Sequence, residues 1–207
     1  LLPRFIMTIF NGTLPQVLIP AVSGTRTEES EARHRKLINN LLSVGTLVGV
    51  PAYALLIYFG PVVVKLMAPG FDGPSLKLCN ELFCYAAIGV PLSFHTEVLS
   101  AYLNSRSVFA LPSGAEAVRS AFVVAALVLF HKTWGIHAAV YGFFVGYVLQ
   151  LLFLAVVSHR AGHRFRFHVH LRDADFRRVM ASLALPTLGA TVNSLPGMVQ
   201  RFLASFL

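Results

Sequence analysis

Six long apolar runs with few charges constrain the fold of this chain more than any other feature. A bilayer core of about 30 Å is crossed by about 20 helical residues, and most of these runs reach that length. Charged residues make up only 13% of the 207 residues, about half the share that soluble domains carry. We therefore expect an all-α, polytopic membrane helix bundle, with helices at 1–22, 37–67, 76–103, 113–131, 135–158 and 173–207.

The two ends of the sequence indicate a piece of a longer protein. The chain starts at Leu1 rather than at a methionine, and it both begins and ends inside apolar runs. It also lacks the basic start, short apolar core and cleavage site of a signal peptide. We expect residues 1–207 to form one transmembrane bundle of a larger chain.

The distribution of basic residues predicts the orientation in the membrane. If each run crosses once, loops 23–36, 104–113 and 159–178 share one face and hold eleven lysines and arginines, against three on the other face. Such an excess marks the cytoplasmic side. The net charge of +8 then reflects topology and contact with anionic lipids, and not binding to nucleic acid.

The first run has features that a plain membrane anchor lacks. It carries Arg4, the sequence Asn11-Gly12-Thr13, and two prolines, Pro15 and Pro20. A helix that breaks and keeps an arginine at depth is typical of a segment that lines a polar path. We expect this helix to break at residues 11–13 and to carry function.

Other charged residues within the apolar runs allow a structural and a functional interpretation. For Glu97, which has His95 nearby, structural pairing is favoured over a proton or substrate role. Glu116 and Arg119 are three residues apart, so they share a helix face and are expected to form an internal ion pair or an interfacial anchor. Arg201 either snorkels to the outer surface or faces a central cavity.

The most basic loop alternates basic or histidine residues with apolar ones over 164–171. A period of two predicts an extended segment on the membrane surface, with its apolar side toward lipid. A solvated basic loop is favoured over a metal site made by His163, His168 and His170, because no cysteine or acid stands at ligand spacing. Asp173 is the predicted N-cap of the following helix.

The sequence contains none of the common enzyme motifs. H-E-x-x-H, G-x-S-x-G and the Gly-rich phosphate loop are all absent. Gly142 and Gly146 form a G-x-x-x-G pair that permits close helix packing, a frequent pattern in membrane proteins. We expect no catalytic residue, no metal and no other cofactor.

A series of short motifs along the whole chain resembles one family of membrane transporters. The motifs are Ile9-Phe10 with Gly12 and Pro20, the turn MAPGF at 67–71, LNSRSVFALPS at 103–113, Gln150 late in an apolar helix, LPTLG at 185–189 and RFLASFL at 201–207. Together they are similar to MurJ/MviN-type lipid II flippases of the MOP exporter superfamily. MAPGF lies outside and LNSRSVF inside in this family, which agrees with the charge count.

The resemblance implies both architecture and function. Family members have about fourteen membrane helices in two pseudo-symmetric lobes, so this chain would be half of a two-lobed transporter, comprising its second to seventh helices in the N-terminal lobe. The implied activity is alternating-access transport of undecaprenyl-pyrophosphate-linked peptidoglycan precursor to the outer leaflet of the bacterial inner membrane. Implied partners are this lipid-linked precursor, membrane lipids and the cell-wall synthesis machinery. Coupling to a monovalent cation or to the membrane potential is also implied.

The family cavity is cationic because its cargo carries a pyrophosphate. Two arginine positions of the family's second helix align with Met7 or Thr8, so we interpret Arg4, one turn earlier, as a shifted positive charge. The family's acidic residue before the glycine is Asn11 here. The implied substrate-binding residues are Arg4, Gly12, Gln16 and Arg201.

Late in the seventh helix, some family members hold a monovalent cation with an acid, and Gln200 stands at that position as a weak neutral ligand. Two alternative functions stay open. One is export of polysaccharide repeat units within the same superfamily. The other is a non-transporting membrane scaffold in envelope assembly.

Overall fold

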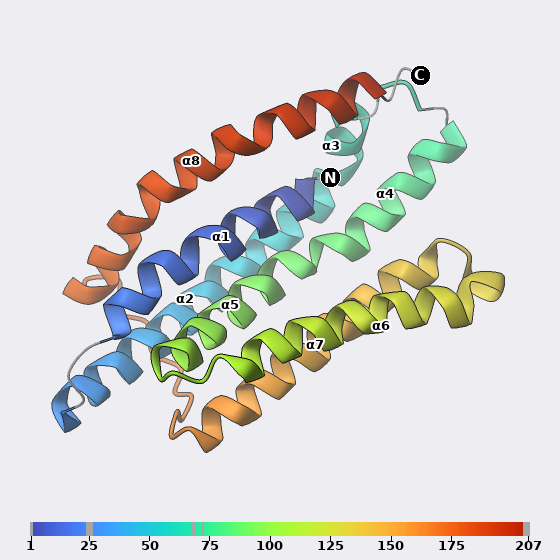
Figure 1. The fold of residues 1–207 in the computed structure, drawn as a ribbon. Helices are drawn as coiled ribbons and strands as arrows, with labels where there is room; N and C mark the ends of the chain where they lie inside the picture. The colour runs from blue at the N-terminus through green and yellow to red at the C-terminus, as the bar shows by residue number, and fades with distance from the viewer. Residues whose placement is uncertain (1, 24–26, 68, 72, 205–207) are drawn as a thin grey trace.

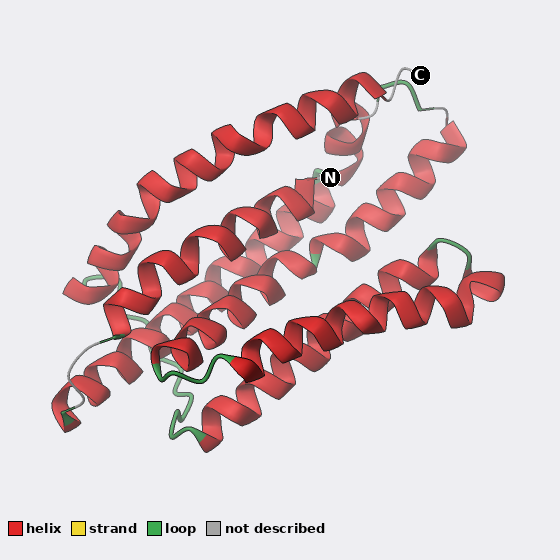
Figure 2. Cartoon of the chain, viewed as in Figure 1, coloured by secondary structure: helices red, strands yellow, loops and turns green. Residues whose placement is uncertain are grey.

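A computed structural model describes residues 2–23, 27–67, 69–71 and 73–204, with the side chains of residues 2, 4, 5, 8–10, 194, 195 and 197–204 outside the description. All regular structure in this part of the chain is helical (Figure 2), which confirms the predicted all-α class. The helices are α1 (Leu2–Val22), α2 (Glu28–Tyr58), α3 (Gly60–Met67), α4 (Gly73–Ala87), α5 (Gly89–Ser105), α6 (Ala110–Trp134), α7 (His137–Arg160) and α8 (Ala174–Ala204).

The long helices lie side by side along one direction (Figure 1). α6 and α7 form an antiparallel pair, and α1 packs between α5 and α8. The main apolar core lies where α1, α2 and α5 meet, and it includes Leu14, Leu18, Ile38, Val98 and Tyr102, each no more than 1% exposed. This core holds α1 rigidly against the rest of the bundle.

Four helical segments of the described residues are long and apolar enough to cross a membrane. They are Glu28–Tyr58, Gly73–Ser105, Ala110–Trp134 and His137–Arg160. Many large apolar side chains on these segments face outward, such as Val124 at 62% and Leu129 at 70% exposure. Outward-facing apolar side chains on long helices suit contact with lipid. The predicted crossings at 1–22 and 173–207 stay predictions, because both include residues outside the description.

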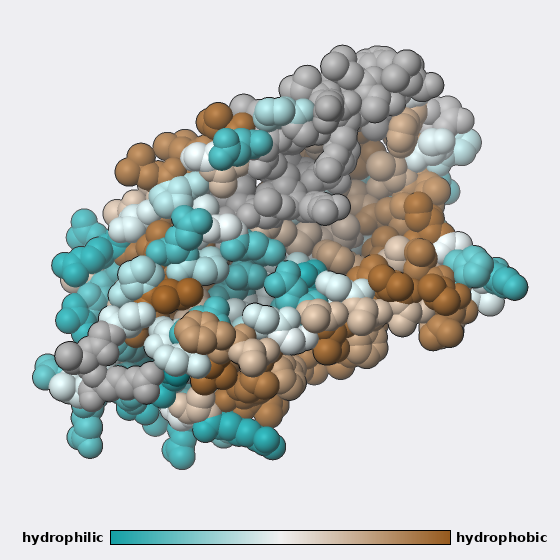
Figure 3. Space-filling model, viewed as in Figure 1, coloured by the Kyte–Doolittle hydropathy of each residue, from teal (hydrophilic) through white to brown (hydrophobic). Residues whose placement is uncertain are grey.

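The three loops expected on the cytoplasmic face lie at the same end of the bundle (Figure 1). Hydrophilic residues gather at this end, whereas hydrophobic residues dominate the opposite half (Figure 3). Hydrophilic atoms also lie midway along the face shown, over α5 and between α1 and α6. This face therefore has a polar middle.

The hydrophilic segment 23–36, expected as a loop, is mostly helical, because α2 begins at Glu28. Thr27 caps this start in a capping box: its side chain accepts from Ser30 N, and the Ser30 side chain accepts from Thr27 N. Glu28, Glu29 and Glu31 occupy the first turn, where they interact favourably with the helix dipole. The charges that suggested a loop therefore stabilise a helix start.

The break expected at residues 11–13 is also wrong, because α1 is continuous from Leu2 to Val22. Pro15 and Pro20 lie inside it, and each removes one backbone hydrogen bond. One face of the helix is nevertheless buried in the core through Leu14, Leu18 and Val22. Packing along this face compensates for the weak local propensity of the sequence.

A short interruption at Ile88, three residues before Pro91, separates α4 from α5. Proline lacks the N–H that would bond to Ala87, so the ladder is interrupted on the N-terminal side of the ring. Pro91 itself lies in the first turn of α5, where a missing donor is tolerated.

Candidate functional site

A charged cluster lies between α5, α6 and α7, about halfway through the bundle. Arg119 Nη2 is 3.3 Å from Glu116 Oε1, so the ion pair expected from their spacing is present. The Arg119 side chain is 15% exposed and the Glu116 side chain 63%. The pair therefore has a buried cation and an open carboxylate.

The ring of Tyr147 on α7 contacts the Arg119 guanidinium. The Arg119 guanidinium lies 4.4 Å from the centre of the Tyr147 ring, a cation–π contact. Tyr147 is 3% exposed, and its hydroxyl lies 3.6 Å from Met7 Sδ on α1. Met7, aligned with a family arginine, is thus buried inside the bundle against α7. The positive charge in contact with Tyr147 belongs to Arg119 of α6.

Glu97 joins the cluster from α5 and interacts electrostatically with Glu116 and Arg119. It lies eight residues before the cytoplasmic end of α5, about 12 Å by helical rise. Arg119, nine residues into α6, is about 14 Å from the same side. These charges therefore lie near mid-membrane, where ionisable residues are costly and usually functional.

Small residues bring α6 and α7 close enough to form this cluster. A Cβ added to Gly142 would lie 2.5 Å from Ala126 Cβ, and one added to Gly146 would lie 3.0 Å from Arg119 O. Both glycines are therefore required for the close approach of α6, as the G-x-x-x-G spacing predicts. The sequence pattern identified this contact, but not that it positions Arg119.

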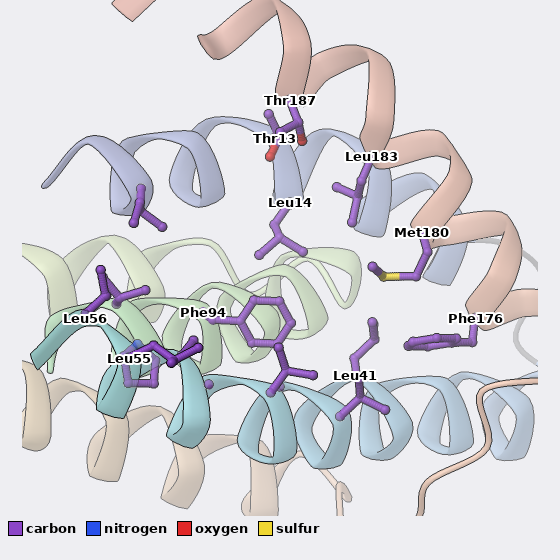
Figure 4. Close-up of a pocket in the computed structure, with 18 of the residues that line it drawn as sticks. Thr13, Leu14, Leu41, Leu55, Leu56, Phe94, Phe176, Met180, Leu183 and Thr187 are labelled. Carbon is purple, nitrogen blue, oxygen red and sulfur yellow. The ribbon is translucent and has the colours of Figure 1, made fainter. Parts of the chain in front are cut away.

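An apolar groove runs between α8 and the α2–α5 pair, with α1 along one side (Figure 4). Its volume is about 520 Å³. Met180 and Leu183 of α8 face Leu41 of α2 across it, and Thr13 and Thr187 are the polar residues in its lining. Such a surface accommodates hydrocarbon and excludes charged groups. Sequence reasoning missed this groove, because its lining comes from four separate helices.

The basic loop before α8 is extended, as the alternation predicts, and α2 holds it by a ladder of side-chain hydrogen bonds. Asn39 Nδ2 donates to Arg164 O and Asn39 Oδ1 accepts from Arg166 N, at 3.3 and 3.2 Å. Asn40 makes the same pair of bonds with the backbone of His170, both 2.8 Å. Ser43 Oγ accepts from His168 N at 2.9 Å. We call residues 163–171 the strap.

Ion pairs reinforce the same end of the molecule. Arg33 pairs with Asp175 at the start of α8, and this contact keeps the pKa of the Asp175 carboxyl below its usual value. Arg106 lies 3.3 Å from Glu31 and donates to Ala161 O at 3.1 Å. Asp173 Oδ1 accepts from Asp175 N and Phe176 N, which confirms the predicted N-cap. Together these contacts join α2, α5 and α8.

His163 contradicts the expectation of a solvated basic loop. It is 3% exposed, and its ring lies 5.0 Å from that of Tyr102. Burial and the neighbouring Arg106 and Arg35 lower the pKa of His163 to about 4. The other two histidines, His168 and His170, stack on each other in the exposed part of the strap. No group of three metal-binding side chains occurs among the described residues.

The remaining predicted residues are placed as follows. Gly12 and Gln16 lie one turn apart on an exposed face of α1, away from the buried Leu14 and Leu18. His95, near Glu97 in sequence, is 2.9 Å from Thr46 Oγ1 of α2 and so faces another helix. Arg4, Gln200 and Arg201 belong to α1 and α8, but their side chains lie outside the description.

Membrane-length helices, a charged cluster within the bundle and basic loops at one end define a class: a polytopic membrane protein of transporter type. The family model described as "Lipid II flippase MurJ" matches residues 1–207. The chain belongs to this family.

Similar proteins agree with that assignment. "Probable lipid II flippase MurJ" of Buchnera aphidicola subsp. Acyrthosiphon pisum is 23% identical over 221 residues, which cover all of this chain and 41% of the relative. The protein of the same name from Rickettsia prowazekii is 23% identical over 218 residues, with the same coverages. The chain thus spans about two fifths of the length of these curated relatives.

A solved structure titled "Lipid II flippase MurJ, inward closed conformation" has the same fold. Its TM-score is 0.79 at 17% identity, over 99% of this chain and 42% of the solved one. The fold of the described helices is therefore that of one part of a known transporter architecture.

Proposed function

We propose that this chain is part of a lipid II flippase that moves lipid-linked peptidoglycan precursor from the cytoplasmic to the outer leaflet of the bacterial inner membrane. The observation that carries the proposal is the match of the flippase family model over all 207 residues. The protein would work by alternating access of two lobes and would form or break no covalent bond. This chain would contribute its second to seventh membrane helices.

Two surfaces of the bundle suit the two halves of such an amphiphile. The apolar groove beside α8 accepts hydrocarbon, and the polar middle of the α1–α5–α6 face suits a charged headgroup. The basic cytoplasmic end would attract a pyrophosphate from that side through its positive potential. These features support the proposed cargo class without specifying its sugar or peptide.

Gly12 and Gln16 would contact the cargo from the open face of α1, with Arg4 and Arg201 supplying positive charge. A weak cation site would involve Gln200, coupled to a monovalent cation or to the membrane potential. The cell-wall synthesis machinery would supply and remove the cargo on the two sides of the membrane.

Genetic rescue tests the proposed cargo. The full-length gene should restore growth of a bacterium depleted of its own lipid II flippase. Membrane-localised protein that fails to rescue would overturn the assignment. Rescue of a strain that lacks a polysaccharide-repeat exporter, without rescue of the flippase-depleted strain, would favour the alternative cargo.

Arg4→Ala in the full-length protein should reduce translocation of the precursor roughly 10- to 100-fold, because a charged hydrogen bond contributes about 1.5–3 kcal/mol. Translocation is measured in proteoliposomes that contain the purified protein. Arg4→Lys keeps the charge and should retain most activity, and Lys132→Ala, at the exposed far end of α6, serves as a control that also removes one positive charge. Unchanged transport by Arg4→Ala would show that the positive charge has not shifted to this position.

A further inference from the structure

The charges of the mid-membrane cluster do not balance. Glu97 and Glu116 bring two carboxylates, whereas Arg119 is the one cation that interacts with them among the described side chains. If both acids were ionised, the cluster would hold one uncompensated negative charge at about half depth. Such a charge is costly in a membrane and needs a partner or a proton.

Arg119 can pair with either acid. Its Nη2 contacts Glu116 at 3.3 Å, but its Nε is buried without a hydrogen-bond partner among the described residues. The guanidinium also lies 4.4 Å from the centre of the Tyr147 ring. A guanidinium has five N–H donors, so Arg119 keeps donors for Glu97, with which it interacts electrostatically, beside those that Glu116 uses.

The surroundings of Glu97 contain no other charged partner among the described side chains. α6 contributes Glu116 and Arg119, and α7 contributes the phenol of Tyr147, which is 3% exposed. On α5 itself, His95 is held by Pro91 O and the Thr46 hydroxyl of α2. From α1, Met7 approaches Tyr147, while the side chain of Arg4 lies outside the description.

A neutral polar side chain on α7, close in sequence to Tyr147, also has an unsatisfied acceptor. Gln150 lies three residues after Tyr147 on the buried face of α7, is 7% exposed, and has a buried Oε1 without a partner among the described residues. A buried acceptor that lacks a donor is costly. The O–H of a protonated carboxylic acid, or a water bound to it, is a donor of the required kind.

We propose that Glu97 is a proton-binding carboxylate that competes with Glu116 for Arg119. When Arg119 pairs with Glu116, Glu97 takes up one proton and the cluster is neutral. When Arg119 turns to Glu97, that proton leaves and Glu116, which is more exposed, stays ionised in contact with the open face. A metal cation is disfavoured as the ligand, because Arg119 would repel it.

If Arg119 exchanges between Glu97 of α5 and Glu116 of α6, transport could be coupled to the uptake and release of a proton at Glu97. This coupling rests on the proposed function, whereas proton binding by Glu97 does not. The two parts can therefore be tested separately.

Infrared titration of the purified full-length protein in lipid nanodiscs tests proton binding. Across roughly pH 5–8, where ordinary carboxylates stay ionised, the wild type should show a protonated carboxylic acid that titrates away as pH rises. Glu97→Gln should remove this signal. Glu116→Gln should remove it too, because Arg119 then pairs permanently with Glu97.

Glu81→Gln is the matched control, since the Glu81 side chain on α4 is half exposed and lies beside His137, and it should leave the signal unchanged. A signal that persists in Glu97→Gln, or that survives in Glu116→Gln, would overturn the proposal. Folding of each variant is checked by its elution as a monodisperse species.

Transport in proteoliposomes tests the coupling. An imposed pH gradient should change the wild-type rate several-fold and leave the rate of Glu97→Gln unaffected. If the infrared signal behaves as expected but no precursor moves in any variant, the proton site stands and the proposed function fails. If precursor moves with equal gradient dependence in Glu97→Gln, the coupling role is wrong.

Discussion

Three polar side chains of α2 bind the strap to this helix: those of Asn39, Asn40 and Ser43. All three are buried, at 7%, 2% and 0% exposure, and in isolation each would be costly in an apolar setting. Their side chains instead satisfy backbone groups of the extended strap, with five hydrogen bonds in total. An asparagine amide carries a donor and an acceptor side by side, so it pairs with one residue of extended backbone as a neighbouring strand would.

Asn40→Ala should loosen the strap, because it leaves His170 N without its partner and removes one of the two hydrogen bonds to His170 O, which also accepts from Asp173 N. We expect local opening to become easier by about 2–3 kcal/mol. Hydrogen exchange of the amides at 166–170 in the full-length protein measures this. Lys36→Ala, on the exposed side of the same helix, should leave exchange unchanged. Equal exchange in wild type and Asn40→Ala would show that the strap is held by other contacts.

His163 should make the strap sensitive to acid. Its pKa is about 4 in the folded state and about 6.5 when exposed, so only the opened strap takes up a proton between these values. The free energy needed to open the strap is therefore constant well above pH 6.5. It falls as pH decreases below that value, by about 2 kcal/mol at pH 5. Hydrogen exchange at pH 7 and pH 5 tests this.

His163→Phe keeps the ring packing against Tyr102 and should remove that pH dependence, whereas His168→Phe in the exposed strap should retain it. A pH dependence that is the same in His163→Phe and in wild type would assign the effect to another group.

At the scale of elements, helix contacts decide where charges meet. α6 and α7 approach closely because Gly142 and Gly146 present no side chain to α6. Only this spacing places the Arg119 guanidinium on the Tyr147 ring. The close contact between α6 and α7 therefore also positions the Arg119 side chain against Tyr147.

Gly142→Ala should destabilise the full-length protein by about 1–3 kcal/mol, because the added methyl would lie 2.5 Å from Ala126 Cβ and overpack the contact. Thermal unfolding in detergent, followed by loss of the monodisperse species, gives the change in Tm. Gly114→Ala on α6 is the matched control, since nothing lies within 4 Å of its added Cβ. Gly114→Ala should raise the Tm slightly, because alanine has a higher helix propensity than glycine. A Gly142→Ala variant as stable as the wild type would mean that α6 and α7 can separate freely.

At the scale of the whole molecule, the loops at 104–113 and 163–171 share one end, opposite the α6–α7 turn. Ser107→Cys in a cysteine-free full-length protein should react with an impermeant thiol reagent only from the cytoplasmic side. Thr133→Cys, in the last turn of α6, should react only from the outside. Labelling is measured in intact cells and in inside-out vesicles. The reverse pattern would contradict the orientation inferred from the basic loops.

Several features of the fold could be predicted from local sequence. Apolar run length predicted the four segments that are long and apolar enough to cross a membrane among the described residues, and the Asp173 cap and the extended strap follow from their own residues. The errors came where local signals compete with packing. Pro15 and Asn11-Gly12 predicted a break that burial of Leu14 and Leu18 overrides, and the acidic residues before α2 stabilise a helix that composition assigned to a loop.

Sequence by itself determined the class of this protein, because membrane crossing depends on apolar length and basic loop charge, and both are properties of contiguous residues. It also determined the family, since the motifs stand in order along the chain. Only the tertiary structure decided which charges meet. Glu97, Arg119 and Tyr147 come from three helices, and their partnership depends on helix rotation and on the close approach that two glycines allow. Met7 is buried for the same reason: the face of α1 that packs on α5 and α7 is set by the whole bundle.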